Sequence, residues 1–278
     1  MNTRSTTQAF LHDRTRTLSY VLSDDATRRA AVVDSVLDYD PASRLIATTS
    51  CDEVLAYLAA QSLQLDWILE THPHADHLSG ARYLRERAGG RIAIGAGICA
   101  VQALFQKLHA GECEVDFATD GSQFDHLFQD DEVFRIGELE ARALHVPGHT
   151  PADLAYLIDD KVFVGDTLFM PDAGSARTDF PGGDARRLHR SIQRLLDLPL
   201  STVIYVCHDY PTPLRAAAWR TTVADQRAFN VHARIDVSED AFVAMRRARD
   251  AILPVPALLM PSLRVNLRAG CWLAVDGT

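Results

Sequence analysis

Metal-capable side chains follow several apolar, strand-like segments of this chain. The first group comes directly after the run LDWILET, in an HxHxDH motif formed by His72, His74, Asp76 and His77. Three later segments lead to His149 in HVPGHT, Asp166 in FVGDT and His208 in VCHDY. Imidazole and carboxylate groups together suit zinc, iron or manganese without any cysteine. Chance would rarely produce this arrangement, so the sequence predicts a metal site built from several strand ends.

The other histidines and the cysteines show no comparable pattern. We interpret six histidines as surface or packing residues, namely His12, His109, His126, His145, His189 and His232. The five cysteines are odd in number and form no CxxC pair, which indicates neither a disulfide framework nor a thiolate zinc site. A nucleophilic Cys207 beside His208 is an alternative that we rank below a buried, small hydrophobic cysteine.

The hydrophobic pattern predicts an α/β chain in which strands and helices alternate. Strands are expected at 18–23, 30–36, 65–71 and 201–210, with several more within 131–167, and helices at 50–63, 79–88 and 184–198. A capping box of Ser50 and Glu53 is expected to begin the first helix. Ligand sites in α/β folds gather beyond the strand ends, on loops held by a rigid scaffold.

Length and charge fit one domain without a nucleic-acid or membrane partner. The chain has 278 residues, and we expect a single domain over 1–278, with a flexible N-terminus at 1–15 and a C-terminal extension over about 211–278. The net charge of −9 argues against nucleic-acid binding and against docking on anionic membranes. There is no apolar run of membrane-spanning length and no apolar core of a secretory signal, so we expect a cytoplasmic protein.

The order of these ligand candidates resembles the metallo-β-lactamase superfamily. The resemblance covers nearly the whole chain and implies an αββα four-layer sandwich, with helices outside and metal in a cleft at one edge. It also implies, for members with two metal ions, one ion held by His72, His74 and His149, a second held by Asp76, His77 and His208, and Asp166 between them. Such a pair of ions activates water for hydrolysis.

Within that superfamily, several segments resemble the persulfide dioxygenase branch, also called sulfur dioxygenases. These segments are GHTPADLAYLI, VGDTLFMPDAGSARTDFPGG and CHDYP, together with TTVADQRAFN and PSLRVNLRAG in the tail. The resemblance implies a single Fe(II) held by His72, His149 and Asp166, and the oxidation of glutathione persulfide by O2 to sulfite and glutathione. The remaining four candidates would then orient the ligands and tune the iron.

Two other functions stay open at this point. The first is a glyoxalase II-like thioester hydrolase with two zinc, iron or manganese ions, because all seven ligand candidates are retained and the motif cannot count the ions. The second is a non-enzymatic metal-binding or redox-sensing protein, which we rank low because such a protein would be expected to lose ligands. The sequence does not decide which thiol carries the persulfide or whether the chain forms a homodimer.

Four polar residues are candidates for binding glutathione. Arg177 is placed to clamp a carboxylate, Asp179 to meet the ammonium group or to hold Arg177, and Tyr210 to donate a hydrogen bond, with Arg268 a weaker candidate. The alternative for each is a structural hydrogen bond or a surface charge. A longer stretch around 117–134 is expected to be a lid or a dimer contact, between which the sequence does not decide.

Overall fold

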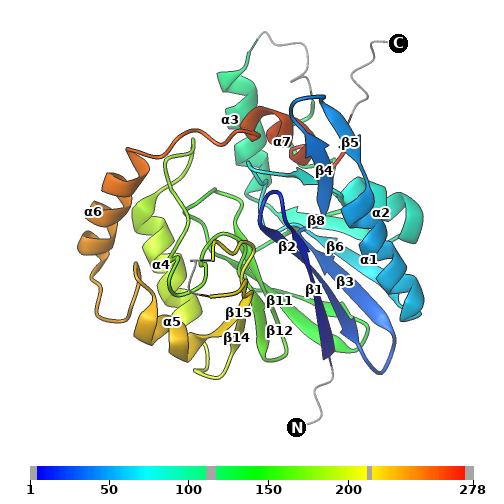
Figure 1. Ribbon diagram of the computed structural model, residues 1–278, viewed down its shortest axis with the longest axis horizontal. Coiled ribbons are helices and arrows are strands. Elements are labelled where there is room, and N and C mark those ends of the chain that lie inside the picture. The colour runs from blue at the N-terminus through cyan, green and yellow to red at the C-terminus, as the bar shows by residue number, and fades with distance from the viewer. Residues whose placement is uncertain (1–4, 111–116, 212–214, 273–278) are drawn as a thin grey trace.

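Two six-stranded β-sheets pack face to face at the centre of the molecule, and helices lie on both outer sides (Figure 1). This computed structural model describes residues 5–110, 117–211 and 215–272. In spatial order, the first sheet consists of β1 (Ser5–His12), β2 (Thr17–Asp24), β3 (Arg29–Val33), β6 (Gln64–Leu69), β8 (Arg91–Gly95) and β9 (His126–Phe128). The second consists of β10 (Glu132–Ile136), β11 (Leu139–His145), β12 (Leu154–Ile158), β13 (Lys161–Phe163), β14 (Val203–Tyr205) and β15 (Arg220–Thr222).

A small third sheet and seven helices complete the described part of the chain. The third sheet has the order β5 (Leu45–Ala47), β4 (Val36–Asp40) and β7 (Leu78–Ser79). The helices are α1 (Thr49–Ala60), α2 (Ala81–Ala88), α3 (Ile98–Leu108), α4 (Ala185–Leu196), α5 (Val223–Phe229), α6 (Glu239–Asp250) and α7 (Leu259–Asn266). Among the described residues, none of these helices is both long enough and apolar enough to span a membrane.

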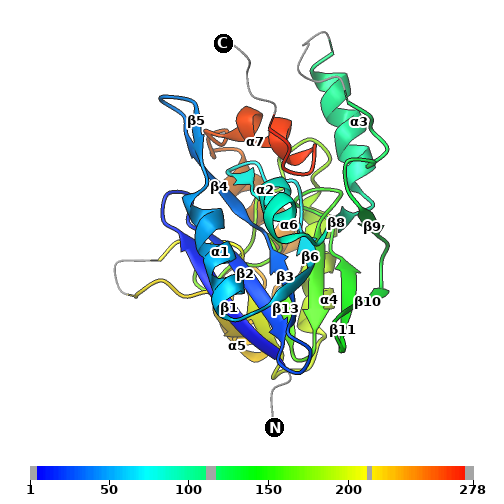
Figure 2. The same cartoon turned by 90° about the vertical axis from the view of Figure 1, so that its right-hand side faces the viewer.

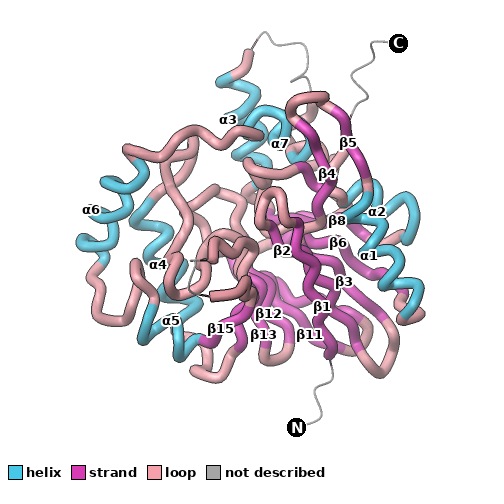
Figure 3. The backbone as a smooth tube through the Cα atoms, viewed as in Figure 1, coloured by secondary structure: helices cyan, strands magenta, loops and turns pink. Residues whose placement is uncertain are grey.

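Alternating side chains along the strands produce the layers. On β2, Tyr20 and Leu22 belong to the hydrophobic core shared with the second sheet and α4, whereas Val21 belongs to the core shared with α1 and α2. On β6, Trp67 packs inward in the same way and Ile68 packs outward. Successive side chains of a strand point to opposite faces, so each strand contributes to both cores. The αββα sandwich implied by the resemblance is therefore confirmed, with strands inside and helices outside (Figure 3).

The expectation of a flexible N-terminus is wrong for most of residues 1–15. Ser5–His12 forms β1, and it pairs antiparallel with β2 along its whole length. Figure 2, turned by 90°, shows β1 and β2 beside α1. The segment MNTRSTTQAFLH contains no strong alternation, so its strand character comes from pairing with β2 rather than from its own pattern.

The predicted capping box at the start of α1 is also absent. The helix begins at Thr49, two residues earlier than that box requires, and Thr48 stands at the N-cap. The Ser50 hydroxyl instead donates to Oδ1 of Asp38 at 2.9 Å. A tertiary contact to β4 has replaced the local capping interaction.

The described residues of the segment 117–134 contribute to a sheet edge. His126–Phe128 forms β9, which pairs parallel with β8, and β10 begins at Glu132. None of these described residues lines either of the two cavities beside the strand-end cluster. The segment therefore gives no support to a lid, and a dimer contact stays a prediction.

Candidate metal centre

The seven predicted ligands meet at one edge of the sandwich, beyond the ends of four strands. His72, His74, Asp76 and His77 follow β6, His149 follows β11, Asp166 follows β13 and His208 follows β14. Strands β13 and β14 are parallel, so their carboxyl ends lie at the same edge. The Leu154 amide donates to the Thr71 carbonyl at 2.8 Å and joins the two sheets beside the cluster. The sequence prediction that these side chains lie together is confirmed.

A close approach of two loops depends on Gly165, which precedes Asp166. Its φ of +53° lies in the left-handed region, and a Cβ at this position would stand 2.6 Å from Oγ1 of Thr71. Only glycine tolerates both conditions without strain. The glycine thus allows the carboxylate from the second sheet to approach the histidines that follow β6.

Three donor atoms converge in the first ligand group. Nε2 of His72 and Nε2 of His149 lie 3.8 and 3.7 Å from the same oxygen, Oδ2 of Asp166. Donor atoms about 2.0–2.2 Å from a shared ion are separated by roughly 3–4 Å. The spacing of these three atoms therefore suits one metal ion.

The second ligand group contains His74, Asp76, His77 and His208, whose donor atoms lie within 4.8 Å of one another. Nε2 of His208 is 3.4 Å from Oδ2 of Asp76 and 3.3 Å from Oδ1 of Asp166. Asp166 thus directs one oxygen toward each group. This arrangement leaves room for one ion or for two ions that share Asp166.

Unsatisfied buried atoms test whether the site suits a metal. The buried side-chain atoms without a hydrogen-bond partner in the described structure include Nε2 of His72, Nδ1 of His74, Nε2 of His77, Nε2 of His208 and Oδ1 of Asp166. Buried polar atoms are nearly always paired, so their gathering at one place requires an explanation. Burial also lowers the pKa of His72 and of His74 well below the usual value, which keeps both rings in the neutral form that binds metals. The residues fit a divalent transition metal.

Comparison with known proteins agrees with this geometry. The model of the metallo-beta-lactamase superfamily matches residues 12–208. The chain belongs to this superfamily. A probable metallo-hydrolase of Burkholderia pseudomallei is 51% identical over 95% of this chain and 93% of its own length. Glyoxylase B2 of Dictyostelium discoideum is 46% identical over 97% of this chain and 92% of its own length.

Relatives of lower sequence identity include proteins named ETHE1. The human mitochondrial persulfide dioxygenase ETHE1 is 27% identical over 91% of this chain and 84% of its own length. The crystal structure of ETHE1 from Myxococcus xanthus superposes with a TM-score of 0.76 at 26% identity, covering 96% of this chain and all (100%) of the other. That match extends beyond residue 208, so it includes most of the C-terminal extension.

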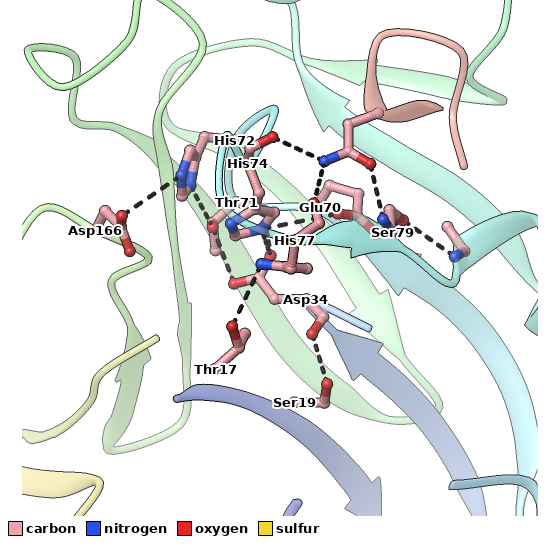
Figure 4. A network of polar contacts seen from close by, with 12 residues as sticks. Thr17, Ser19, Asp34, Glu70, Thr71, His72, His74, His77, Ser79 and Asp166 are labelled. Atoms are coloured by element: carbon pink, nitrogen blue, oxygen red, sulfur yellow. Dashed lines mark hydrogen bonds and ion pairs between the residues drawn. The ribbon is translucent and has the colours of Figure 1, made fainter. Parts of the chain in front are cut away.

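Asp34 orients two of the predicted metal ligands, His72 and His74. It was not among the site residues predicted from the sequence. It follows β3 with a φ of +51°, and it accepts hydrogen bonds from the amide and the hydroxyl of Thr71 at 2.8 and 2.9 Å. Its Oδ1 lies 3.1 Å from Nε2 of His74, and the Thr71 hydroxyl lies 3.0 Å from Nδ1 of His72 (Figure 4). Each ring therefore keeps its other nitrogen for a metal. The signal in the sequence was one more polar residue at the end of an apolar run, AAVVD.

Asn266 of α7 fixes the loop that carries the HxHxDH motif. Its Oδ1 accepts from the Ser79 amide at 2.7 Å, and its Nδ2 donates to the carbonyls of His74 and His77, both at 2.8 Å. The side chain is buried. A residue of the C-terminal extension thereby holds the backbone of three positions in and beside the motif.

A cavity of about 540 Å³, the polar cavity, opens onto the predicted metal ligands and is lined by charged as well as apolar side chains. Asp76, His149 and Asp166 line it, and so does Tyr210, whose ring stacks on His208 with 5.9 Å between centroids. The Tyr210 side chain is half exposed, and its position beside the cluster agrees with the predicted role. Its contact with a substrate stays a prediction.

Arg177 lines the same cavity, but its guanidinium is already engaged. Nε and Nη2 each lie 2.6 Å from a carboxylate oxygen of Asp179, and Nη1 donates to the Pro254 carbonyl at 2.7 Å. The Arg177 carbonyl also accepts from Nδ1 of His149 at 2.8 Å. These contacts make Arg177 and Asp179 a structural pair that supports a ligand. They give no support to a free carboxylate clamp.

The structure separates Arg268 from the cavity and brings Arg249 to it. The Arg268 guanidinium lies over the Phe117 ring at 5.2 Å, and Arg268 lines neither cavity. Arg249 is exposed on α6 at the cavity, and no described residue pairs with its guanidinium. Nearby Arg246 is buried and held by Asp250. Sequence reasoning missed Arg249 because MRRARD is typical of the solvated face of a helix.

Proposed function

We propose that the protein is a persulfide dioxygenase that oxidises glutathione persulfide with O2 to sulfite and glutathione. The observation that carries the proposal is the convergence of His72, His149 and Asp166, since Nε2 of each histidine lies 3.8 or 3.7 Å from the same Asp166 oxygen. Two histidines and one carboxylate on one face of an Fe(II) ion leave open positions, as in non-haem oxygenases. The similarity to ETHE1 over nearly the whole chain supports the same reaction.

The reaction needs one O2 and one water for each persulfide. The outer sulfur receives three oxygen atoms, two from O2 and one from water, the S–S bond breaks, and glutathione leaves with its thiol. Bound iron would supply the electron transfer between the persulfide and O2. The protein residues orient the ligands: Thr71 fixes the ring of His72, and the Arg177 carbonyl fixes that of His149.

Arg249 is the residue that we expect to bind a carboxylate of glutathione. It is exposed at the cavity and has no partner among the described residues, whereas Arg177 and Arg246 are held by carboxylates. In Arg249→Gln, kcat/KM for glutathione persulfide should fall about tenfold, since a hydrogen bond to a charged group contributes on the order of 1.5 kcal/mol. Steady-state kinetics measures this effect.

Arg247→Gln is the matched control for that variant. Arg247 is also exposed on α6 but lines neither cavity, so its replacement should leave kcat/KM within twofold. An equal loss in both variants would point to the general charge of the helix rather than to a contact with the substrate.

A metal-dependent hydrolase acting on glutathione thioesters is the second candidate. It is favoured by the position of Asp166, whose Oδ1 lies 3.3 Å from Nε2 of His208 while Oδ2 faces His72 and His149. This geometry can hold two ions. The relatives of higher identity bear the names of a metallo-hydrolase and a glyoxylase, which supports the same alternative.

Metal content measured together with turnover separates the two candidates. Protein purified without added metal should contain about one iron per chain and consume O2 when glutathione persulfide is added. Two metal ions per chain, with release of D-lactate from S-D-lactoylglutathione and no O2 uptake, would establish the hydrolase instead. Asp76→Ala sharpens the comparison, because it should abolish a reaction that needs a second ion but only weaken one that needs a single ion.

A further inference from the structure

A second cavity, of about 100 Å³, lies beside one predicted metal ligand, His149, and its lining is more apolar than that of the first cavity. Its walls are apolar and come mainly from α3, through Leu104 and Phe105, and from α7, through Met260 and Leu263. Gln102 of α3 donates to the Leu267 carbonyl at 2.9 Å, which holds the two helices together at one end of the molecule (Figures 1 and 2). The cavity therefore lies between two fixed helices.

The two cavities share part of their walls beside the predicted ligand His149. Ala75, His149 and Phe180 line both of them. The Phe180 ring stands edge-on to the His149 ring at 5.4 Å between centroids. A small molecule in the apolar cavity would thus lie next to a predicted iron ligand, separated from the polar cavity by one aromatic ring.

His109, His149 and Thr150 line the apolar cavity, and the last two have hydrogen-bond partners in the described structure, which disfavours an ordered water beside them. The Thr150 hydroxyl donates to Oδ1 of Asp153 at 2.5 Å, and the Thr150 amide donates to Oδ2 at 2.7 Å. Nδ1 of His149 is bonded to the Arg177 carbonyl, and its Nε2 faces Asp166. A buried water needs two to four polar partners, and apolar cavities of about 150 Å³ stay dry and bind xenon or benzene.

We propose that this apolar cavity is a dioxygen-binding site that supplies O2 to the metal centre. The inference rests on the proposed dioxygenase function. Glutathione persulfide carries charges that are costly to transfer into an apolar space, and the polar cavity with Arg249 suits it. Dioxygen is small, uncharged and apolar, and it fits the smaller cavity. The two substrates would then reach the same ligands from different sides.

Xenon and a cavity-filling variant test the proposal. A crystal of the wild-type protein under xenon pressure should show xenon between α3 and α7, and Leu104→Trp should abolish it. With saturating glutathione persulfide, kcat/KM for O2 should fall at least fivefold in Leu104→Trp, while kcat/KM for the persulfide changes less than twofold. Leu104→Phe fills less of the cavity and should lower kcat/KM for O2 by a smaller factor. This variant tests the proposal even if Leu104→Trp does not fold.

Leu253→Trp is the reciprocal variant, because Leu253 lines only the polar cavity. It should lower kcat/KM for the persulfide and leave kcat/KM for O2 within twofold. The proposal is overturned if xenon does not enter the cavity, if kcat/KM for O2 is unchanged in both Leu104 variants, or if these variants impair the persulfide as much as O2. That last result would place the organic part of the substrate in the cavity. Failure of the wild-type protein to consume O2 would instead refute the proposed function itself.

Discussion

Asp34 shows how a single side chain that holds no substrate can define the geometry of the metal centre. It accepts two hydrogen bonds from Thr71 and lies 3.1 Å from Nε2 of His74, so it orients His74 directly and His72 through Thr71. Burial raises its pKa to about 6, and the Thr71 hydrogen bonds oppose that rise. Burying this carboxylate is therefore unfavourable for its charged form, yet its hydrogen bonds fix the orientation of His72 and His74.

We expect Asp34→Asn to weaken metal binding by roughly 10- to 100-fold, the usual effect of losing a group that orients a metal-bound histidine. Titration against a competing chelator measures the affinity. Asp38→Asn is the control, because Asp38 accepts hydrogen bonds from Ser50 of α1, and its polar contacts within the described residues include none of the predicted ligands. Equal affinities of Asp34→Asn and the wild-type protein would show that Thr71 and the loop hold the histidines without the carboxylate.

His232 makes the stability of the protein sensitive to acid. Burial, with Arg246 and Arg249 nearby, lowers its pKa to about 4, although Asp250 acts in the opposite direction. Its Nδ1 accepts the Ser175 amide at 3.0 Å, a contact that a protonated ring cannot make through that atom. Because the unfolded chain takes up this proton near pH 6.5, the contribution of neutral His232 is present above that pH and lost as the pH falls toward 4.

In His232→Gln, the unfolding free energy should fall less steeply between pH 6.5 and 4 than in the wild-type protein, by on the order of 1–3 kcal/mol over that range. Urea unfolding at a series of pH values measures the difference. Parallel curves for the two proteins would mean that other groups dominate the acid response.

At the scale of the element, α7 connects the C-terminal extension to the ligand loop. Asn266 bonds to the Ser79 amide and to the carbonyls of His74 and His77, while Val265 packs in the core shared with α1 and α2. The superfamily match ends at residue 208, yet this later helix holds the backbone of the HxHxDH motif. The extension is thus a structural part of the centre.

Asn266→Ala should reduce the unfolding free energy by on the order of 3 kcal/mol, because it leaves three buried backbone groups unpaired, and it should also weaken metal binding. Asn230→Ala is a matched control. Asn230 is equally buried and bonds to the Gly174 carbonyl and the His232 amide, away from the ligands. It should lower stability by a similar amount without changing metal affinity, measured by denaturant unfolding and chelator competition. If both variants lose metal equally, global stability rather than α7 controls the loop.

At the scale of the whole molecule, the centre joins the two sheets. The histidines of the HxHxDH motif come from the first sheet, whereas His149, Asp166 and His208 come from the second. An ion held by His72, His149 and Asp166 would therefore link both halves of the sandwich. A ligand that binds only the folded state adds its binding free energy to stability.

Metal should consequently raise the unfolding free energy by about 2.7 kcal/mol when the free ion exceeds its Kd 100-fold. Calorimetry of the metal-free and iron-loaded protein, prepared without O2, measures the change. The His72→Ala/His149→Ala double variant should show no such increase. An unchanged unfolding temperature on loading the wild-type protein would mean that the ion binds the unfolded chain as well.

Local sequence was sufficient to predict a set of candidate ligands and the α/β class of the fold. HxHxDH, His149, Asp166 and His208 combine residue types with strand-end positions, and that information is local, so it could be read before any contact was known. The predicted strands at 18–23, 30–36 and 65–71 and the predicted helices at 50–63, 79–88 and 184–198 are confirmed to within a few residues, because their apolar periodicity is strong. The strand predicted at 201–210 is shorter and covers only Val203–Tyr205.

Which side chains surround these candidates depends on tertiary contacts. The pairing of Arg177 with Asp179, the distance of Arg268 from the cavity, the exposure of Arg249 and the clamp made by Asn266 all depend on contacts between segments far apart in the chain. Strand β1 forms by pairing with β2. The Ser50 hydroxyl bonds to Asp38 of β4 and does not cap its own helix. Local sequence encodes what a residue can bind, but which partner it finds depends on the packing of the two sheets and their helices.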